Sequence, residues 1–392
     1  MDPSLIPDNP YLLLTPGPLS TTKSVRAAML RDWCTWDADY HALVQDMRAR
    51  LVRLATRHAG YTAVPMQGSG TFNVEAAIGS AIPPDGKLLV LSNGAYGHRM
   101  GQIADRLRIS CRLIDSGEAA PTPSTLLERA LETDQQISHV GVVHCETTSG
   151  ILNPVREICE VANRYGRTTI VDAVSSFGGI LLDVADWGID FLVGSSNKCI
   201  QGVPGFGFVI ARSDKLQATR GRARSLSLDL YDQWVEMDTK GGRWRFTSPT
   251  HVVRAFLQAL MELEAEGGVD ARHIRYVQNH AVLVDGMRAL GFQCFLPDHL
   301  QSPFITTFRY PAHPAFRFER FYQELKGRGF VIYPGKVTKA DTFRIGTIGA
   351  VTPADIRRLI SAVAESMYWD PAAGRSLQDR DQLRRLAETG CR

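Results

Sequence analysis

The sequence has 392 residues, with 44 Lys and Arg against 41 Asp and Glu, so its formal net charge is +3. A balance this even argues against a protein that binds nucleic acid or another polyanion through a basic surface. Hydrophobic residues make up 44% and charged residues 22%, which indicates a sizeable core and argues against a disordered chain. The length predicts two domains, or one large domain with a smaller partner.

The seven cysteines form no Cys-x-x-Cys pair, so the sequence predicts neither a disulfide framework nor a zinc site. The ten histidines contain no His-Glu-x-x-His motif, and no metal site is predicted from them. The N-terminus lacks the basic and apolar segments of a signal peptide, and no apolar run is long enough to cross a bilayer. Together these features predict a cytoplasmic protein.

The N-terminal 20 residues are rich in proline and predict an extended arm. Apolar residues at helical spacing then predict helices over residues 21–30 and 41–56. Runs that are apolar throughout follow, as in strands buried on both faces of a parallel sheet, over residues 87–91, 139–144, 168–172, 190–194 and 205–210. A helix with Asn153 as its predicted cap and Pro154 at its start separates two of these runs. The alternation predicts a doubly wound α/β domain that binds its ligand at the carboxyl ends of the strands.

The pattern changes to α+β near residue 272. Helices are predicted over residues 276–290 and 316–326, with a last helix opened by Pro353. Strands are predicted over residues 292–295, 304–308, 330–333 and 342–345. The expected organisation is an arm (residues 1–20), a large domain (21–271), a small C-terminal domain (272–372) and a polar surface tail (373–392).

A glycine-rich segment, Gln67-Gly-Ser-Gly-Thr-Phe-Asn73, immediately precedes a predicted helix. Glycines let the backbone approach a ligand closely, and the start of a helix offers free N–H groups and the positive end of its dipole. Ser69, Gly70 and Thr71 therefore form a candidate phosphate cradle, although the spacing fits neither the P-loop nor the dinucleotide motif. An ordinary glycine-rich turn is the alternative.

Two ionisable residues stand at the carboxyl ends of predicted strands. Asp172 closes one apolar run, where a carboxylate is unfavourable unless it is paired; it either caps the next segment or pairs with a cationic ring nitrogen. Lys198 follows another run in a loop of small residues, where desolvation can lower its pKa as Schiff-base chemistry requires, although a solvated loop lysine is the plainer interpretation. A phosphate cradle, a strand-end carboxylate and a strand-end lysine are the fixed contacts that pyridoxal phosphate needs.

Arg344 lies between Phe343 and Ile345 in a predicted strand of the small domain. It is either an outward-facing residue of a half-exposed strand or a bidentate clamp for a substrate oxyanion. His144 and Cys145 are adjacent on a strand and point to opposite faces, which argues against a catalytic Cys-His pair.

These residues resemble the class-V group of fold-type I pyridoxal-phosphate aminotransferases. The likeness extends over residues 11–370, and its most specific segment is Ser196-Asn-Lys-Cys-Ile-Gln-Gly-Val-Pro-Gly205; the cradle segment and Val171-Asp-Ala-Val-Ser-Ser176 carry it further. The resemblance implies an α/β fold with a mostly parallel central sheet, helices on both faces and a smaller α+β C-terminal domain. It also implies pyridoxal 5'-phosphate as the cofactor.

The resemblance implies three residues that act in the reaction. Lys198 would bind the cofactor as a Schiff base and then move the proton between the substrate carbon and the cofactor. Asp172 would pair with the pyridinium nitrogen and so keep the ring an electron sink. Arg344 would bind the substrate anion.

The remaining implied contacts hold the cofactor in place. Its phosphate would be bound by Ser69, Gly70 and Thr71 of one chain, with Thr247 supplied by the other subunit of a homodimer. Tyr96 would stack on its ring, and Val174 would pack on the opposite face. The hydroxyl of Thr147 would lie near the ring oxygen.

Within this group the resemblance is strongest to the enzymes that transfer the amino group of 2-aminoethylphosphonate to pyruvate, a reaction of phosphonate catabolism that gives phosphonoacetaldehyde and L-alanine. The expected partners are these two small substrates, with no nucleic acid and no membrane. The alternative within the group is a transaminase that acts on alanine or serine with glyoxylate or pyruvate. A cysteine desulfurase needs an exposed nucleophilic cysteine on a mobile loop, whereas Cys294 lies in an apolar run. A non-catalytic protein of this fold would tolerate the loss of Lys198 or Asp172, yet both are present.

Overall fold

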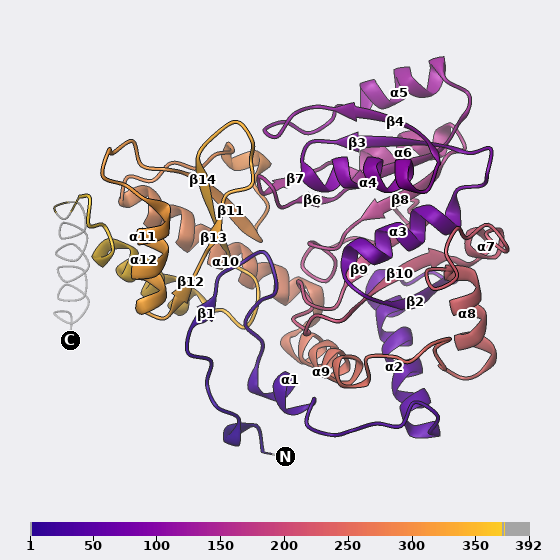
Figure 1. Ribbon diagram of the computed structural model, residues 1–392, viewed down its shortest axis with the longest axis horizontal. Helices are drawn as coiled ribbons and strands as arrows, with labels where there is room; N and C mark the ends of the chain where they lie inside the picture. The colour runs from indigo at the N-terminus through magenta and orange to yellow at the C-terminus, as the bar shows by residue number, and fades with distance from the viewer. Residues whose placement is uncertain (1, 371, 373–392) are drawn as a thin grey trace.

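The computed structural model describes residues 2–370 and 372, and its main body is a seven-stranded sheet with helices on both faces (Figure 1). The strands lie in the order β2 (Tyr61–Gln67), β10 (Phe206–Arg212), β9 (Phe191–Ser195), β8 (Thr168–Asp172), β5 (Ile137–Val143), β3 (Lys87–Ser92) and β4 (Ser110–Asp115). From β9 to β4 the strands are parallel to one another, whereas β10 is antiparallel to both of its neighbours. The prediction of a mostly parallel sheet is therefore confirmed.

Successive strand residues face opposite sides, so the sheet contributes to two cores. Ile170 of β8, for example, packs into one core and Val171 into the other. One face is covered by α2 (Ala38–Ala55), α5 (Ser124–Thr133), α6 (Val155–Arg164) and α9 (Thr250–Glu266). The other face is covered by α3 (Gly70–Ala81), α4 (Ala95–Arg106), α7 (Ser213–Gln217) and α8 (Leu230–Thr239).

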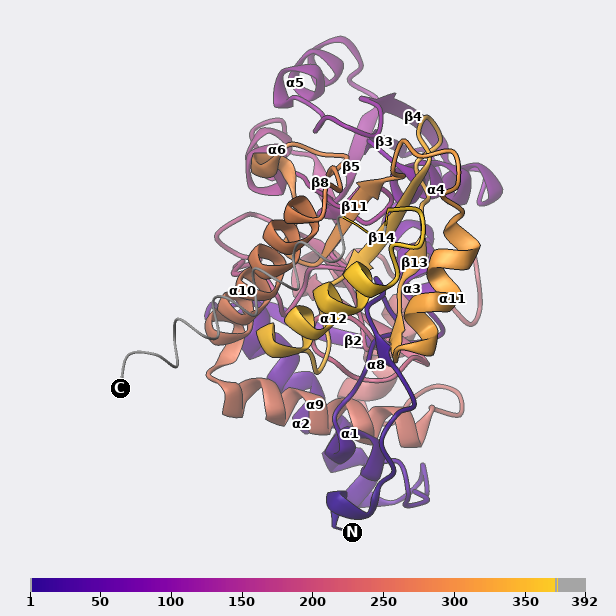
Figure 2. The same ribbon diagram turned by 90° about the vertical axis from the view of Figure 1, so that its left-hand side faces the viewer.

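The small domain has a three-stranded antiparallel sheet in the order β11 (Ile305–Arg309), β14 (Thr342–Gly346) and β13 (Tyr333–Pro334). Its core is rich in aromatic rings and is closed by α10 (Gly268–Ala289), α11 (Phe318–Gly327) and α12 (Pro353–Glu365). In Figure 2 this domain faces the viewer, and the indigo N-terminal arm runs beside it. The arm joins the domain because β1 (Leu12–Leu13) pairs in parallel with β12 (Phe330–Val331), and Leu14 enters the aromatic core.

Short elements complete the described chain. They are η1 (Pro3–Leu5), α1 (Lys23–Ala27), β6 (Cys145–Glu146), β7 (Ile151–Leu152) and η2 (Asp298–Leu300). No helix among residues 2–370 and 372 has the length and apolar character needed to cross a membrane. The described cysteines are all free thiols.

The apolar runs of the large domain form strands within two residues of their predicted bounds. The two edge strands are not predicted: Pro65 interrupts the pattern of β2, and the residues of β4 are mostly exposed. The predicted strand over residues 292–295 is wrong, because this segment contributes only an isolated bridge between Cys294 and Phe308. The run 330–333 is divided between β12 and β13.

Two predicted details of the helices are also wrong. The helix over residues 21–30 shortens to α1, which ends at Ala27. Asn153 does not cap α6, because its side-chain amide instead donates to the carbonyl of Val143 and to the side chain of Asn93.

The helix α10 joins the two parts of the molecule, and the predicted division at residue 272 falls within it. Arg272 is buried and donates from Nη1 to the carbonyl of Cys199 at 2.8 Å, while the hydroxyl of Tyr276 donates to the same carbonyl at 2.9 Å. Since Cys199 follows Lys198, these contacts anchor the lysine loop to α10. The predicted tail over residues 373–392 lies outside the described residues, and the domain limits remain predictions.

Candidate active site

The candidate residues gather at the carboxyl edge of the parallel strands. Asp172 ends β8, and Lys198 lies three residues beyond the end of β9. Tyr96 lies on α4, which follows β3, and Thr147 follows β6, which comes after β5. Parallel strands deliver their carboxyl ends to a single edge, and the small sheet that carries Arg344 lies against this edge (Figure 1).

Lys198 is partly buried, and its ammonium donates to the carbonyl of Pro16 at 2.7 Å. The arm comes so close that a Cβ atom on Gly17, whose φ is +112°, would lie 2.7 Å from Nζ. This turn of the arm therefore requires glycine. Burial lowers the pKa of the Lys198 amine, which favours the neutral form that acts as a nucleophile or a base.

Asp172 is 6% exposed and accepts a hydrogen bond at Oδ1 from the backbone N–H of Val174 at 2.9 Å. This bond stabilises the turn after β8, but Asp172 is not a helix cap, because no helix lies between β8 and β9. Its second oxygen accepts no hydrogen bond from the described residues, and no Lys or Arg of these residues lies within ion-pair distance of it. Burial raises the pKa of Asp172 to about 6. The carboxylate is therefore held in place without a cationic partner among the described residues.

The predicted cradle lies at the N-terminus of α3. Ser69 precedes the helix as its N-cap, yet its side chain makes no capping hydrogen bond. A Cβ atom on Gly70 would lie 2.7 Å from Cγ2 of Val174, so only glycine fits between the cradle and that side chain. The hydroxyl of Thr71 accepts a hydrogen bond from Nη1 of Arg99 at 3.0 Å. The helix N-terminus and a nearby cation together suit a phosphate.

A buried carboxylate fixes the start of α4. Glu146 is fully buried, and its Oε2 accepts hydrogen bonds from the backbone N–H groups of Tyr96 at 2.9 Å and Gly97 at 3.3 Å. Its Oε1 accepts from the backbone N–H of Thr148 at 3.1 Å. A Cβ atom on Gly94 would lie 2.5 Å from Cγ of Glu146, so the residue before the helix has to be glycine. Glu146 thus acts as a distant cap that sets the position of Tyr96.

Cations surround the ring of Tyr96. The guanidinium carbon of Arg99 lies 4.8 Å from the ring centroid, and Nζ of Lys336 lies 4.3 Å from it. Burial of Tyr96 acts in the opposite direction, but Lys336 and Lys198 lower the pKa of its hydroxyl. This part of the site therefore favours anions.

Arg344 is 5% exposed on β14, so the outward-facing alternative is wrong. Its Nε donates to the carbonyl of Pro334 at 2.9 Å and its Nη1 to the carbonyl of Thr147 at 2.8 Å. Nη2 has no hydrogen-bond partner in the described part of the chain, and no carboxylate there forms an ion pair with this arginine. Burial lowers the pKa of Arg344. The guanidinium is oriented by backbone groups and keeps an uncompensated charge for a ligand.

Three residues of this region are not predicted from the sequence, namely Arg99, Glu146 and Lys336. Arg99 lies one helical turn after Tyr96, and Lys336 follows Pro334-Gly335 a few residues before Arg344. Neither position in the sequence distinguishes these two residues from cations on the surface. Thr247 is exposed in the segment between α8 and α9 and makes no hydrogen bond with the other candidate residues.

The residues present fit pyridoxal phosphate. Asp172 is a buried carboxylate without a cationic partner among the described residues, and the buried hydroxyl of Thr147 lies beside the hydroxyl of Tyr96. Buried charges in native proteins are normally paired, so Asp172 indicates that a ligand completes the site. The cradle at α3 suits the phosphate of such a ligand, and Lys198 suits a covalent link to its carbonyl carbon.

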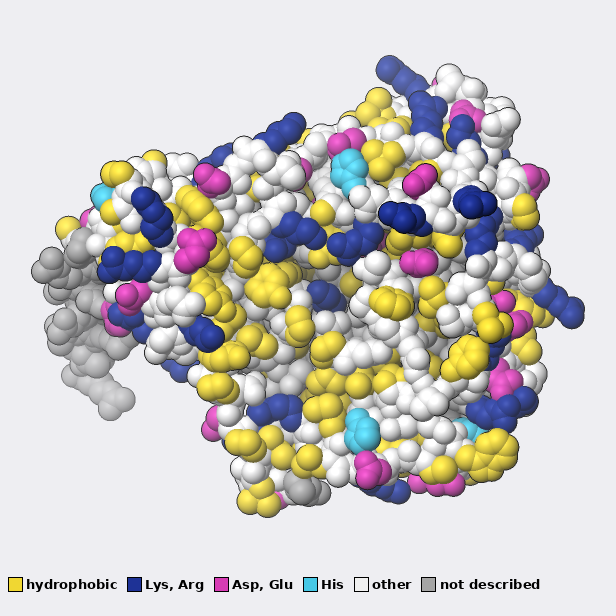
Figure 3. Space-filling model, in the orientation of Figure 1, with side chains coloured by type: hydrophobic (Ala, Val, Ile, Leu, Met, Phe, Trp, Pro, Cys, Tyr) yellow, Lys and Arg dark blue, Asp and Glu magenta, His cyan; other side chains and the backbone are white. Residues whose placement is uncertain are grey.

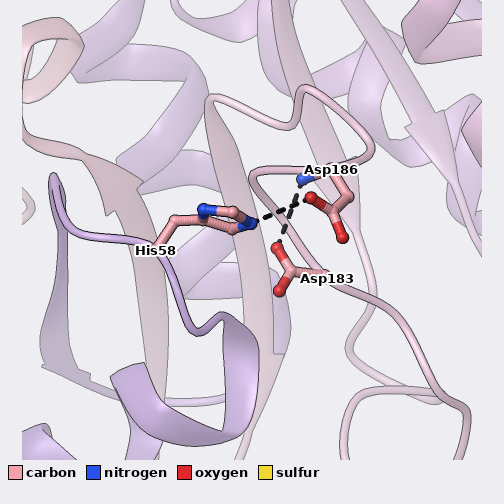
Figure 4. Close-up of side chains that lie close together, drawn as sticks. All are labelled: His58, Asp183 and Asp186. Atoms are coloured by element: carbon pink, nitrogen blue, oxygen red, sulfur yellow. Dashed lines mark hydrogen bonds and ion pairs between the residues drawn. The ribbon is translucent and has the colours of Figure 1, made fainter.

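One further group of side chains could by proximity hold a metal ion, and it is shown in Figure 4. His58 Nε2 lies 3.0 Å from Oδ1 of Asp186. Asp183, however, accepts hydrogen bonds from the hydroxyl of Thr56 and from the backbone N–H groups of Arg57, Ala185 and Asp186. The chain itself uses this carboxylate to hold the turn before β9, at the amino end of the strands and away from Lys198.

The unpaired state of Asp172 predicts that Asp172→Asn stabilises the protein free of cofactor. The raised pKa means that the ionised carboxylate destabilises the fold above pH 6, and that this penalty disappears as the pH falls towards 4. The gain in free energy of unfolding should therefore be small near pH 4 and reach about 3 kcal/mol above pH 7. Urea unfolding of both proteins across this range measures it. A gain that does not change with pH, or a loss at pH 8, would contradict the assignment of an unpaired charge.

Comparisons with known proteins agree with this geometry. Residues 31–336 match the family described as Aminotransferase class-V. A 2-aminoethylphosphonate–pyruvate transaminase from Syntrophobacter fumaroxidans is 62% identical over 368 residues, which cover 94% of this chain and 99% of that protein. One from Vibrio vulnificus is 59% identical over 365 residues, covering 93% and 100%. The solved pyridoxamine–pyruvate aminotransferase from Mesorhizobium loti has the same fold, with a TM-score of 0.83 at 24% identity over 95% of this chain and 98% of that one. The chain belongs to the class-V aminotransferase family.

Proposed function

We propose that this protein is a pyridoxal-phosphate-dependent transaminase that moves the amino group of 2-aminoethylphosphonate to pyruvate and releases phosphonoacetaldehyde and L-alanine. The observation that carries the proposal is that a desolvated Lys198 lies in the same site as Asp172 and Arg344, which are both buried and have no ion-pair partner among the described residues. The relatives with that name match almost the whole chain at 58–62% identity, which supports this substrate pair.

The cofactor is the first ligand of the proposed site. Ser69, Gly70 and Thr71 bind its phosphate at the N-terminus of α3, and Asp172 pairs with its ring nitrogen. When bound, pyridoxal phosphate withdraws electrons from the reacting carbon of the amino substrate, which makes a proton on that carbon acidic. The negative charge of Asp172 keeps the ring nitrogen protonated and so maintains this withdrawal.

Three side chains hold the plane of the ring in this proposal. Tyr96 stacks on one face, in a position that Glu146 fixes through its backbone N–H. Val174 would pack on the other face, and the buried hydroxyl of Thr147 would donate to the ring oxygen.

Lys198 carries the proton in this reaction. A lysine with a lowered pKa is neutral often enough to accept a proton at Nζ and to return it at a second carbon. The carbonyl of Pro16 accepts a hydrogen bond from the same nitrogen and orients it, while Gly17 of the arm covers part of the side chain. Orientation and desolvation thus come from the same turn of the arm.

Arg344 binds both substrates in turn. Each carries an anion a short distance from its reacting carbon, a phosphonate in one half-reaction and a carboxylate in the other. The nitrogen atoms at the Nη1 and Nη2 end of the guanidinium remain available, and arginine donates in a bidentate manner to either anion. Arg344 can therefore contact the anion in both half-reactions.

An exposed apolar patch supports a homodimer. Phe72 is 53% exposed, Phe246 49% and Leu226 77%, and the first two line a cavity of about 250 Å³ that also contacts Gly68 of the cradle. Clusters of large exposed apolar side chains mark interfaces. Thr247 follows Phe246, so a second subunit docked on this patch brings a hydroxyl towards a phosphate site. We propose that it contacts the phosphate bound by the other chain.

The remaining proposals concern organisation and location. The large domain comprises residues 21–271 and the small domain residues 272–372, with the arm completing the small domain. The described thiols are free and suit a reducing compartment, so we propose that the protein acts in the cytoplasm on small substrates.

The test of the proposed function is an assay of the purified, cofactor-loaded protein with 2-aminoethylphosphonate and pyruvate, followed by measurement of L-alanine. Transfer should be rapid, and Lys198→Ala should abolish it because Lys198 is the residue that carries the proton in this proposal. Alanine and serine with glyoxylate serve as the comparison. A protein that ignores 2-aminoethylphosphonate but aminates glyoxylate would support the alternative transaminase instead.

The shared phosphate contact gives a second prediction. Thr247→Ala should weaken retention of pyridoxal phosphate by about 1–3 kcal/mol, the value of a charge-assisted hydrogen bond. Equilibrium titration of the cofactor measures this, and Thr239→Ala, an exposed threonine at the end of α8, is the matched control. Sedimentation should find a dimer, and a fully active monomer is the outcome that would exclude this arrangement.

A further inference from the structure

The hairpin over residues 335–341 places a second cation near Arg344. It joins β13 to β14, and its first turn is closed by Gly335, whose N–H donates to the carbonyl of Thr342 at 2.9 Å. A Cβ atom on Gly335 would collide with that carbonyl. At the tip, the backbone N–H of Thr338 donates to Oε2 of Glu118 in the large domain at 2.9 Å. Both ends of the hairpin are therefore fixed, and Lys336 lies between them.

Lys336 points into the site rather than towards a carboxylate. Its Nζ lies 4.3 Å from the ring centroid of Tyr96, and both Lys336 and Lys198 lower the pKa of the Tyr96 hydroxyl. No Asp or Glu within residues 2–370 and 372 lies within ion-pair distance of it. Lys and Arg side chains form a row across the middle of the face shown in Figure 3. Lys336 is thus a half-buried ammonium with an aromatic partner and no counter-charge.

The two anionic groups that the site receives differ in charge. A carboxylate carries one negative charge, which Arg344 alone can balance. A phosphonate resembles a phosphate monoester, which carries about −1.5 to −2 charges at neutral pH. Two nitrogen atoms of Arg344 also donate hydrogen bonds to the carbonyls of Pro334 and Thr147. A desolvated dianion therefore needs a second cation.

The other cations near Tyr96 are already engaged at the cofactor. Arg99 donates to Thr71 of the cradle and so belongs to the phosphate of the cofactor. Lys198 is the residue that reacts. Lys336 shares a hairpin with Arg344, and it is the cation that remains for the substrate.

We propose that Lys336 is a specificity-determining residue that binds the phosphonate of the amino donor together with Arg344 and selects a dianion over a monoanion. This inference rests on the proposed function, because it assumes that the site receives a phosphonate. Its basis is the fixed hairpin, the ammonium beside Tyr96 and the charge that Arg344 leaves unbalanced.

Calorimetric titration of the cofactor-loaded protein tests this without turnover. The probes, used at a pH above the second pKa of the phosphonate, are ethylphosphonate, there a dianion that lacks the amino group, and its monomethyl ester, which has nearly the same shape and one charge fewer. The variants are Lys336→Met, Lys336→Arg and, as the control, Lys339→Met, an exposed lysine of the same hairpin.

The unmodified protein should bind ethylphosphonate more tightly than the ester. Lys336→Met should raise the dissociation constant for ethylphosphonate roughly tenfold to hundredfold, the effect of losing one charge-assisted hydrogen bond, and should change that of the ester only a few-fold. Lys336→Arg should keep most of the preference, and Lys339→Met all of it. In turnover, Lys336→Met should lower kcat/KM for 2-aminoethylphosphonate by at least tenfold more than for L-alanine.

Two results would overturn the inference. One is an unmodified protein that binds dianion and ester equally; the other is a Lys336→Met variant that loses both equally or neither, since the lysine would then only pack against Tyr96. Failure of the proposed function is a separate outcome. It would show as absent transfer from 2-aminoethylphosphonate, and the calorimetric comparison does not depend on that transfer.

Discussion

Uncompensated charge at the carboxyl edge of the sheet is the constraint on which the rest of the structure depends. Asp172 and Arg344 are both buried, and neither has an ion-pair partner within the described chain. Leaving a charge in this state destabilises the fold, and proteins normally pair or neutralise such groups. We propose that ligands supply the missing partners, a cationic ring nitrogen for Asp172 and a substrate anion for Arg344. In this account the ligands of the site stabilise it.

The fold positions each of these charged groups without giving it a counter-charge. Parallel strands deliver Asp172 and the lysine loop to one edge, and α10 anchors that loop through the carbonyl of Cys199. The small sheet orients Arg344 through Pro334 and a carbonyl of the large domain. The arm closes over Lys198 from a third direction. Segments far apart in the sequence thus fix each charged group by backbone contacts, which cannot neutralise it.

Much of this was accessible from the sequence. Apolar runs bounded by helical patterns predict the parallel strands, because strands buried on both faces are mostly apolar and stand out from the helical pattern. Asp172 and Lys198 could be singled out because a charged residue at or just beyond the end of an apolar run needs an explanation, and Arg344 because it lies between two apolar strand residues. Edge strands carry no such signal: β4 is largely exposed and β2 contains a proline. Glu146, Arg99 and Lys336 act through tertiary contacts with Tyr96, and no local spacing reveals such contacts.

The state of Asp172 tests this account most directly. Infrared difference spectroscopy of protein carrying carboxyl-labelled aspartate, with Asp172→Asn to assign the band, reports its protonation without perturbing the site. In the cofactor-free protein we expect Asp172 to titrate near pH 6, and after saturation with pyridoxal phosphate to stay ionised well below that pH. Titration near pH 4 in the free protein, or a titration that the cofactor leaves unchanged, would contradict the claim that the chain leaves this charge for its ligand to balance.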